Sequence, residues 1–428
     1  MRTDLTTRAD AVPGCDTPKA APAAPRLGAA RALSVAGMRA LSVVAGLGYV
    51  KYYTNELSVQ EVGAFFYLGT LSYILNALVF VPVDSYMQAR LSDMDVLPWR
   101  SIRRLMAVTL LVALCVCVAL SLPFIGMGLL SAQDVPLLYS LAAMLYLCTS
   151  VRNLLNIRGQ ATFASSMIVL ESVSRLLAFM LAVWVVGASA RTLLSSSIAA
   201  LAVELVLLLR QARTTLPLSP QEVVLDHPKQ IWKTTSALSG GAASNTVQLQ
   251  AYRVLFPAAG HAGTVAMLGV PSNIGAVGMS ACAQVFSQLF LPRLYQTRGA
   301  SIRQYVAWGT AMAVVVLAFA LPMSGFLVHH LTRAEYMAYA PAVGVGVVLE
   351  ACNMLIGAFS VYLTLHGRVG AMFRFQLVGA AVSLAGCLAL IMNAPDSPML
   401  IGLVIAGSQL LVTPALAFYV YRLQRQHA

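Results

Sequence analysis

Three cations interrupt the first apolar stretch of the sequence, RALSVAGMRALSVVAGLGYVK, at Arg31, Arg39 and Lys51. An arginine at the centre of a membrane-spanning helix costs roughly 3 kcal/mol on insertion scales. Arg39 lies two helical turns beyond Arg31, at a depth of about 12 Å along a helix. Such a residue needs an acidic partner or an anionic ligand. We expect either an ion pair with Asp84 in the next apolar stretch or exposure to an internal cavity.

A fourth cation, Arg175, lies near the middle of another apolar stretch. Glu171 precedes it by one helical turn, which is the favourable orientation for an ion pair within a helix. Glu204 and Glu350 are the alternative acidic partners. The sequence therefore predicts either a self-contained pair or a cation that faces a cavity, and the two arrangements are compatible.

Arg253 follows the polar sequence SNTVQLQAY, which contains Asn245 and Gln248. These side chains would be unstable against lipid, so this segment is predicted to face protein or water. Lys51 and Arg253 can instead reach the outer interface by snorkelling. Together with Asn273, these polar residues are candidates for binding a substrate, as are Arg39 and Arg175.

The acidic residues of the apolar stretches are few, and each is a functional candidate by default. Glu350 is isolated in GVGVVLEACN, where it would carry a coupling proton or sodium ion, or would neutralise Arg175. Asp84 and Glu171 are further candidates for ion coupling or gating. The sequence leaves these interpretations open.

The composition is that of an all-α, polytopic membrane protein. Of the 428 residues, 59% are hydrophobic and only 10% are charged, whereas soluble domains carry about 25% charged residues. Long apolar stretches that do not alternate indicate helices and not a barrel. We predict twelve spans, at 31–54, 61–90, 102–125, 135–157, 161–187, 192–210, 232–257, 263–292, 302–328, 336–365, 370–392 and 398–421.

The two halves of the chain resemble each other at an offset of about 200 residues. Ser-Ile-Arg begins a span at Ser101 and again at Ser301, and EVGAFFYLGTLS matches HAGTVAMLGVPS, with Gly63 aligned to Gly263. Parallel repeats of this kind place a substrate site between the two halves. The predicted organisation is a disordered tail, a six-helix bundle, a linker and a second six-helix bundle, at 1–30, 31–210, 211–230 and 231–428.

The basic residues indicate the orientation. Most of the 28 Lys and Arg residues fall on one side of the predicted membrane, and only Lys51, Arg191 and Arg333 fall on the other. Both termini are therefore expected in the cytoplasm, and the net charge of +12 requires no nucleic-acid partner. The sequence contains no cysteine–histidine metal spacing and no Walker or hydrolase motif. We expect neither a metal, nor a cofactor, nor an enzymatic activity.

The segment NELSVQEVGAFFYLGTLSYILNALVFVPVDSYMQARL resembles the second-span region of polysaccharide flippases. The shared features are Leu57-Ser58, Glu61, Gly63, an aromatic-rich span and a basic loop. These flippases for O-antigen and exopolysaccharide repeat units belong to the multidrug, oligosaccharidyl-lipid and polysaccharide exporter (MOP) superfamily. The resemblance implies a V-shaped fold like that of the multidrug and toxic-compound extrusion (MATE) transporters.

The resemblance also implies a function. The substrate would be an oligosaccharide on undecaprenyl diphosphate, moved from the cytoplasmic to the outer leaflet of a bacterial inner membrane by alternating access. A polysaccharide polymerase and glycosyltransferases would act beside it. The main alternative is an ion-coupled multidrug antiporter of the same superfamily. A peptidoglycan-precursor flippase fits less well, because that branch usually has fourteen spans. A polymerase fits less well, because it would be expected to carry a large outer loop. A membrane scaffold is a further, non-transport alternative.

Overall fold

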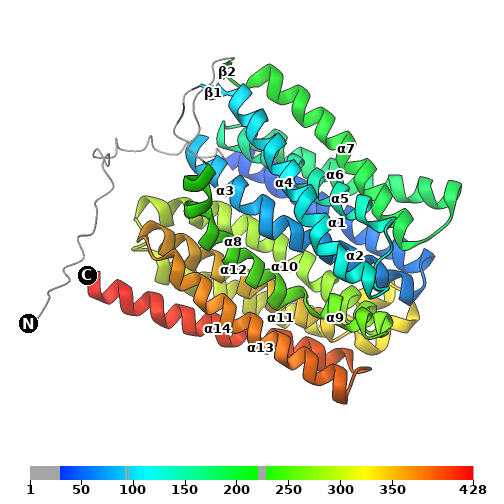
Figure 1. The fold of residues 1–428 in the computed structure, drawn as a ribbon. Helices are drawn as coiled ribbons and strands as arrows, with labels where there is room; N and C mark the ends of the chain where they lie inside the picture. Colours follow the sequence, from blue (N-terminus) through cyan, green and yellow to red (C-terminus); the bar gives the residue numbers. More distant parts are fainter. Residues whose placement is uncertain (1–28, 92–93, 95, 220–227, 428) are drawn as a thin grey trace, which may run out of the picture.

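The computed structural model describes residues 29–427 apart from 92–93, 95 and 220–227, and these are almost entirely helical (Figure 1). The predicted tail, 1–30, lies outside the described residues except for its last two positions, which begin the first helix. The first half of the chain contains α1 (Ala29–Glu56), α2 (Val59–Leu75), the π-helix η1 (Asn76–Phe80), α3 (Val81–Leu91), β1 (Leu97–Pro98), α4 (Trp99–Gly126), α5 (Asp134–Ile157), α6 (Ala161–Val186) and α7 (Ala190–Thr215).

The second half follows the short strand β2 (Leu218–Ser219), which pairs in parallel with β1. In Figure 1 its helices, coloured green to red, lie beside those of the first half. They are α8 (Pro228–Gln250), α9 (Tyr252–Ala258), α10 (Ala262–Gln296), α11 (Ile302–Leu331), the 3-10 helix η2 (Ala334–Tyr339), α12 (Ala342–Leu365), α13 (Val369–Asn393) and α14 (Pro398–His427).

Every predicted span coincides with helical structure, although 232–257 is interrupted at Ala251, between α8 and α9, and 336–365 begins in η2 and continues in α12 after a turn at 340–341. Within the described part of the chain, ten segments are long and apolar enough to cross a membrane, and one of them runs through α2, η1 and α3. The other two predicted spans, 31–54 and 232–257, are helical as α1 and α8–α9. The all-α polytopic fold class is therefore confirmed, although the count of apolar segments is ten and not twelve.

The largest boundary difference lies at the predicted linker, 211–230. Helix α7 continues to Thr215, and β2 follows within the same segment. Gln211, Ala212 and Arg213 have good helix propensity and prolong the helix. It ends before Leu216, because the residue that precedes Pro217 is disfavoured in the α conformation.

The sequence Ser58-Val-Gln-Glu61 fixes the start of α2, the central helix of the first half. The Ser58 hydroxyl accepts a hydrogen bond from the backbone N–H of Glu61, at 3.3 Å, as an N-terminal cap does. The Glu61 carboxylate accepts a hydrogen bond from the backbone N–H of Ala190, at the start of α7. One short motif therefore both begins α2 and ties it to a neighbouring helix.

The two halves meet where α2 crosses α10. A Cβ at Gly63 would lie 2.1 Å from the carbonyl oxygen of Ala262, so only glycine permits this approach. Gly263, its predicted repeat equivalent, lies at the same crossing beside Val59. The segments matched by the sequence repeat thus form one of the contacts between the halves, beside those of α3 with α8 and of α1 with α10.

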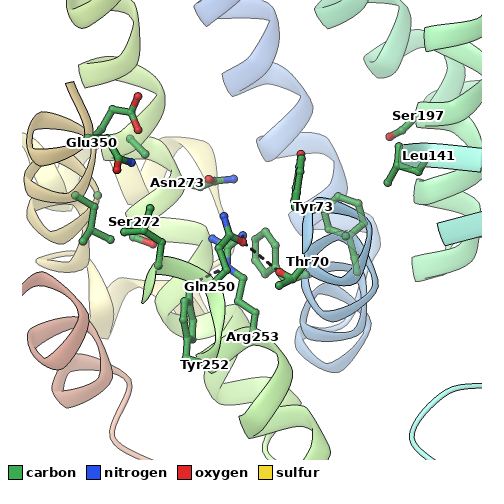
Figure 2. A pocket seen from close by; sticks show the side chains of 18 of the residues that line it. Thr70, Tyr73, Leu141, Ser197, Gln250, Tyr252, Arg253, Ser272, Asn273 and Glu350 are labelled. Atoms are coloured by element: carbon green, nitrogen blue, oxygen red, sulfur yellow. Dashed lines mark hydrogen bonds between the residues drawn. The ribbon is translucent and has the colours of Figure 1, made fainter. Parts of the chain in front are cut away.

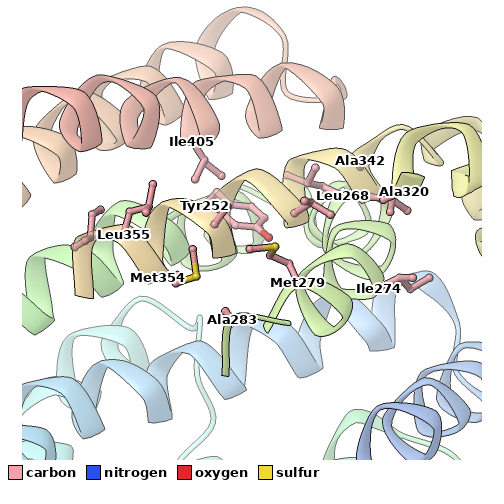
Figure 3. Close-up of a cluster of buried hydrophobic side chains, with 14 of the residues drawn as sticks. Tyr252, Leu268, Ile274, Met279, Ala283, Ala320, Ala342, Met354, Leu355 and Ile405 are labelled. Carbon is pink, nitrogen blue, oxygen red and sulfur yellow. The ribbon is translucent and has the colours of Figure 1, made fainter. Parts of the chain in front are cut away.

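A cluster of buried apolar side chains forms the centre of the second half (Figure 3). Helices α10 and α12 pack closely within it, and α11 and α14 cover them. A Cβ at Gly275 of α10 would lie 2.0 Å from the carbonyl oxygen of Val343, and one at Gly346 of α12 would lie 1.8 Å from that of Ser272. Small residues at helix crossings of this kind are typical of membrane bundles.

We predict that Gly275→Ala destabilises the protein, because the added methyl group forces α10 and α12 apart. The free energy of unfolding should fall by about 1–3 kcal/mol, the usual range for overpacking. The measurement is thermal unfolding of the purified protein in detergent. Gly278→Ala is the matched control on the same helix, since a Cβ there meets nothing within 4 Å. Equal melting temperatures for the two variants would contradict the prediction.

Candidate functional site

A cavity of about 330 Å³ lies between the two halves, and polar side chains from both line it (Figure 2). Helix α2 contributes Thr70 and Tyr73 from one side. The junction of α8 and α9 contributes Gln250, Tyr252 and Arg253 from the other. The remaining polar residues of this cavity, here called the polar cavity, are Arg175, Ser197, Ser272, Asn273, Glu350 and Asn353.

Arg253 carries a positive charge into the polar cavity. Its Nε donates to the Tyr252 hydroxyl at 2.9 Å, and its Nη1 donates to the Gln250 Oε1 at 3.3 Å. The guanidinium carbon lies 4.6 Å from the centre of the Phe66 ring, a cation–π contact. Among the described residues, no carboxylate forms an ion pair with it. Since a guanidinium has five N–H donors, several remain for a ligand.

Arg175 also lines the cavity, but its charge is balanced. Its Nη2 lies 2.6 Å from the Glu171 Oε1, which confirms the pair predicted from their spacing. Arg152 donates to the other oxygen of Glu171, at 2.8 Å, and also to Glu204, whose side chain is fully buried. Two arginines and two glutamates thus form one neutral network that joins α5, α6 and α7.

Arg39 lies in a second cavity of about 360 Å³, here called the inner cavity, which adjoins the polar cavity. Glu350 and Asn353 line both cavities, and Ser280 and Gln284 line the second. The Nε of Arg39 is buried, and it has no hydrogen-bond partner among the described residues. Like Arg253, Arg39 forms no ion pair in the described part of the chain.

The predicted ion pair between Arg39 and Asp84 is wrong. The Asp84 carboxylate instead accepts hydrogen bonds from Gln88 at 2.6 Å, Ser150 at 2.7 Å and Asn153 at 3.0 Å. The physical reason is the packing of α1, which lies mainly against α6 and α10, whereas α3 lies against α5 and α8. Asp84 thus ties α3 to α5 and lies outside both cavities.

Three other predicted binding residues do not line either cavity. Lys51 is exposed on α1. The Gln248 side chain is completely buried and donates to the Ser408 hydroxyl at 3.0 Å. Asn245 contacts Gln409 of α14 at 3.4 Å. Asn245 also donates to the Oδ1 of Asn353, a residue that lines both cavities, at 3.5 Å. The rotation of α8 therefore turns Gln248 toward α14 and turns Gln250 into the cavity.

Several residues of the polar cavity are absent from the predicted site, although helical spacing points to them. Gln250 lies one turn before Arg253, and Asn353 lies one turn after Glu350, so each shares a face with a predicted site residue. Thr70 and Tyr73 are related in the same way on α2. Arg152 gave no such signal, because its acidic partners lie on other helices.

Comparison with known proteins finds no matching family model and no matching curated protein. Solved structures do match over most of the chain. An outward-facing multidrug resistance MATE family transporter of the MOP superfamily has a TM-score of 0.62 and 11% identity, covering 91% of this chain and 94% of that one. A MATE in complex with MaD3S has a TM-score of 0.59 and 11% identity, covering 92% and 96%.

A third similar structure is a MOP superfamily transporter from Pyrococcus furiosus, with a TM-score of 0.54 and 12% identity, covering 92% of this chain and 91% of that one. It is described as having a binding pocket of reverse polarity that suggests a different function. At these identities the likeness defines the fold. The chain has the fold of MATE and MOP superfamily transporters, and its apolar helices are those of a multi-pass membrane protein.

We predict that Glu171→Ala strongly destabilises the protein, because it leaves two partly buried arginines with one remaining carboxylate. Loss of one partner from a buried pair costs about 3–5 kcal/mol. The measurement is the free energy of unfolding in mixed micelles. Glu350→Ala is the control, since Glu350 forms no ion pair within the described residues and should cost much less. Similar losses in both variants would contradict the distinction between a structural and a free carboxylate.

Proposed function

We propose that the protein is a transporter that moves a lipid-linked oligosaccharide across a bacterial inner membrane by alternating access. The substrate carries an undecaprenyl diphosphate and travels from the cytoplasmic to the outer leaflet. The observation that carries the proposal is Arg253, a cation that faces a polar cavity between the two halves and has no acidic partner among the described residues. The likeness of the fold to known transporters supports transport as the activity, without indicating the substrate.

The charge balance of the two cavities favours an anionic substrate. Arg175 is neutralised by Glu171, whereas Arg39 and Arg253 are unpaired in the described part of the chain. Glu350 offsets only one of these two positive charges. A diphosphate can supply the missing negative charge, since guanidinium groups bind phosphate oxygens through two parallel hydrogen bonds. A buried cation that lacks an acid is costly until such an anion binds.

Uncharged polar groups of the cavity suit the sugar part of the substrate. Thr70, Gln250, Ser272 and Asn273 present hydroxyl and amide groups toward the same space (Figure 2). Sugar hydroxyls both donate and accept hydrogen bonds, so amides and hydroxyls are suitable partners. The proposal retains cytoplasmic termini, with glycosyltransferases and a polysaccharide polymerase as partners.

Drug–ion antiport is the second candidate, and Glu350 is the observation that favours it. Its carboxylate lines both cavities and takes no part in an ion pair within the described ranges. It is therefore free to bind a cation, either a coupling ion or an organic substrate. The described pocket of reverse polarity in the Pyrococcus furiosus protein suggests that pocket charge varies on this fold.

We predict that Arg253→Ala and Arg39→Ala each reduce flipping of a fluorescent lipid-linked oligosaccharide in proteoliposomes. Each variant should lose roughly tenfold or more, because hydrogen bonds to charged groups contribute about 1.5–3 kcal/mol. Arg422→Ala is the control, since Arg422 is an exposed cation on α14 that lies outside both cavities. Normal flipping by both cavity variants, with normal folded yield, would reject the diphosphate site.

We predict separately that Glu350→Gln abolishes any dependence of flipping on a proton or sodium gradient while preserving the fold. The amide has nearly the same shape as the carboxylate but cannot carry the exchangeable charge. The measurement compares flipping with and without an imposed gradient in matched proteoliposomes. An unchanged gradient dependence would exclude Glu350 as the coupling group.

A further inference from the structure

A second space between the two halves has an almost entirely apolar lining. This apolar groove has a volume of about 300 Å³ and lies among α2, α4 and α5 of the first half and α8, α9 and α13 of the second. Leu71, Leu120, Phe124, Val254 and Leu255 contribute to its surface. All of these helices are predicted to cross the membrane, so the groove lies at the depth of the lipid chains.

One pair of helical segments separates the apolar groove from the polar cavity. On α2, Thr70 and Tyr73 line the cavity, while Leu71 and Ile74 line the groove. The α8–α9 junction behaves in the same way, since Gln250 and Arg253 line the cavity and their neighbours Ala251 and Val254 line the groove. We call the contact between α2 and α8–α9 the seam.

Two contacts that join the seam depend on groups that bind anions or sugars. The Thr70 hydroxyl donates to the Gln250 Oε1 at 3.2 Å (Figure 2). The Arg253 guanidinium lies over the Phe66 ring of α2 and also donates to the same Gln250 oxygen. A phosphate that bound Arg253 would compete with Phe66 and Gln250 for the guanidinium. Binding of the headgroup would therefore weaken the seam.

We propose that the seam is the lateral opening for a lipid-linked substrate, whose hydrocarbon chain lies in the apolar groove while its diphosphate binds Arg253. This inference rests on the proposed function and identifies the side of the protein through which the lipid passes. The chemistry on the two sides of the seam matches the two ends of such a molecule. A cation faces the headgroup, and a lining that is apolar except for Ser121 faces the chain.

The headgroup explains why this groove would hold a chain in preference to the surrounding bilayer. Lipid chains are as apolar as the groove, so the hydrophobic effect gives little preference between them. A headgroup fixed at Arg253 confines its own chain to the neighbourhood of the seam, which raises the effective concentration of the chain at the groove. Close packing against leucine and phenylalanine side chains then adds dispersion energy.

The test uses undecaprenyl diphosphate that carries a photoreactive diazirine within its chain, in proteoliposomes of the full-length protein. Mass spectrometry of the irradiated protein locates the labelled residues. We expect labelling of the groove residues on α4 and α9. Leu120→Trp, which fills the groove, should reduce this labelling about tenfold, the change expected from losing the packing of a few chain carbons.

Leu122→Trp is the matched control. Leu120 and Leu122 are both exposed residues of α4, at 42% and 61%, but only Leu120 lines the groove. The control variant should label like the unmodified protein. Labelling that Leu120→Trp leaves unchanged, or that concentrates instead between α1 and α10, would overturn the inference.

A second measurement separates this inference from the proposed function. Inorganic pyrophosphate, which has no chain, is titrated into the detergent-solubilised protein by calorimetry. Binding should be lost in Arg253→Ala and kept in Leu120→Trp. Pyrophosphate binding without groove labelling would overturn the lateral opening alone. Failure of the unmodified protein to bind pyrophosphate would overturn the diphosphate site itself.

Discussion

A charged side chain inside a bilayer needs an opposite charge, and this chain meets that constraint in two ways. Arg152 and Arg175 share Glu171, and Arg152 also reaches Glu204, so their charges cancel within the first half. Arg39 and Arg253 have no acidic partner in the described part of the chain. The ion pairs of Arg152 and Arg175 hold helices together. The charges of Arg39 and Arg253 are not balanced in this way, so the space between the halves favours an anion.

The same helices serve two environments, because an α-helix presents different residues at successive positions. Helix α2 turns polar residues to one space and leucines to the other, and the α8–α9 junction does the same. A molecule with a charged end and a hydrocarbon end would meet a polar surface on one side of α2 and α8–α9 and an apolar surface on the other side. The same two helical segments therefore carry both the charged lining of the polar cavity and the apolar lining of the groove.

Hydropathy was sufficient to predict the helices, because a membrane-spanning segment must satisfy its backbone hydrogen bonds internally. The pair of Arg175 with Glu171 was also predictable, since both lie on one helix. The partners of Arg152 and Asp84 were not, because they depend on which helices become neighbours. Whether Gln248 or Gln250 lines the cavity depends on how α8 is rotated about its axis. The packing of α8 against α13 and α14 determines that rotation.

The π-helical segment Asn76–Phe80 has a mechanical consequence for α2. It ends two residues before Pro82, which lacks a backbone N–H and would clash with a carbonyl in a regular helix. A π turn holds one residue more than an α turn. Removal of that extra residue from the turn would twist α2 by about 100° relative to α3. The π segment is therefore the position along this helical run at which a change of one residue in the turn would rotate the cavity-lining part relative to α3.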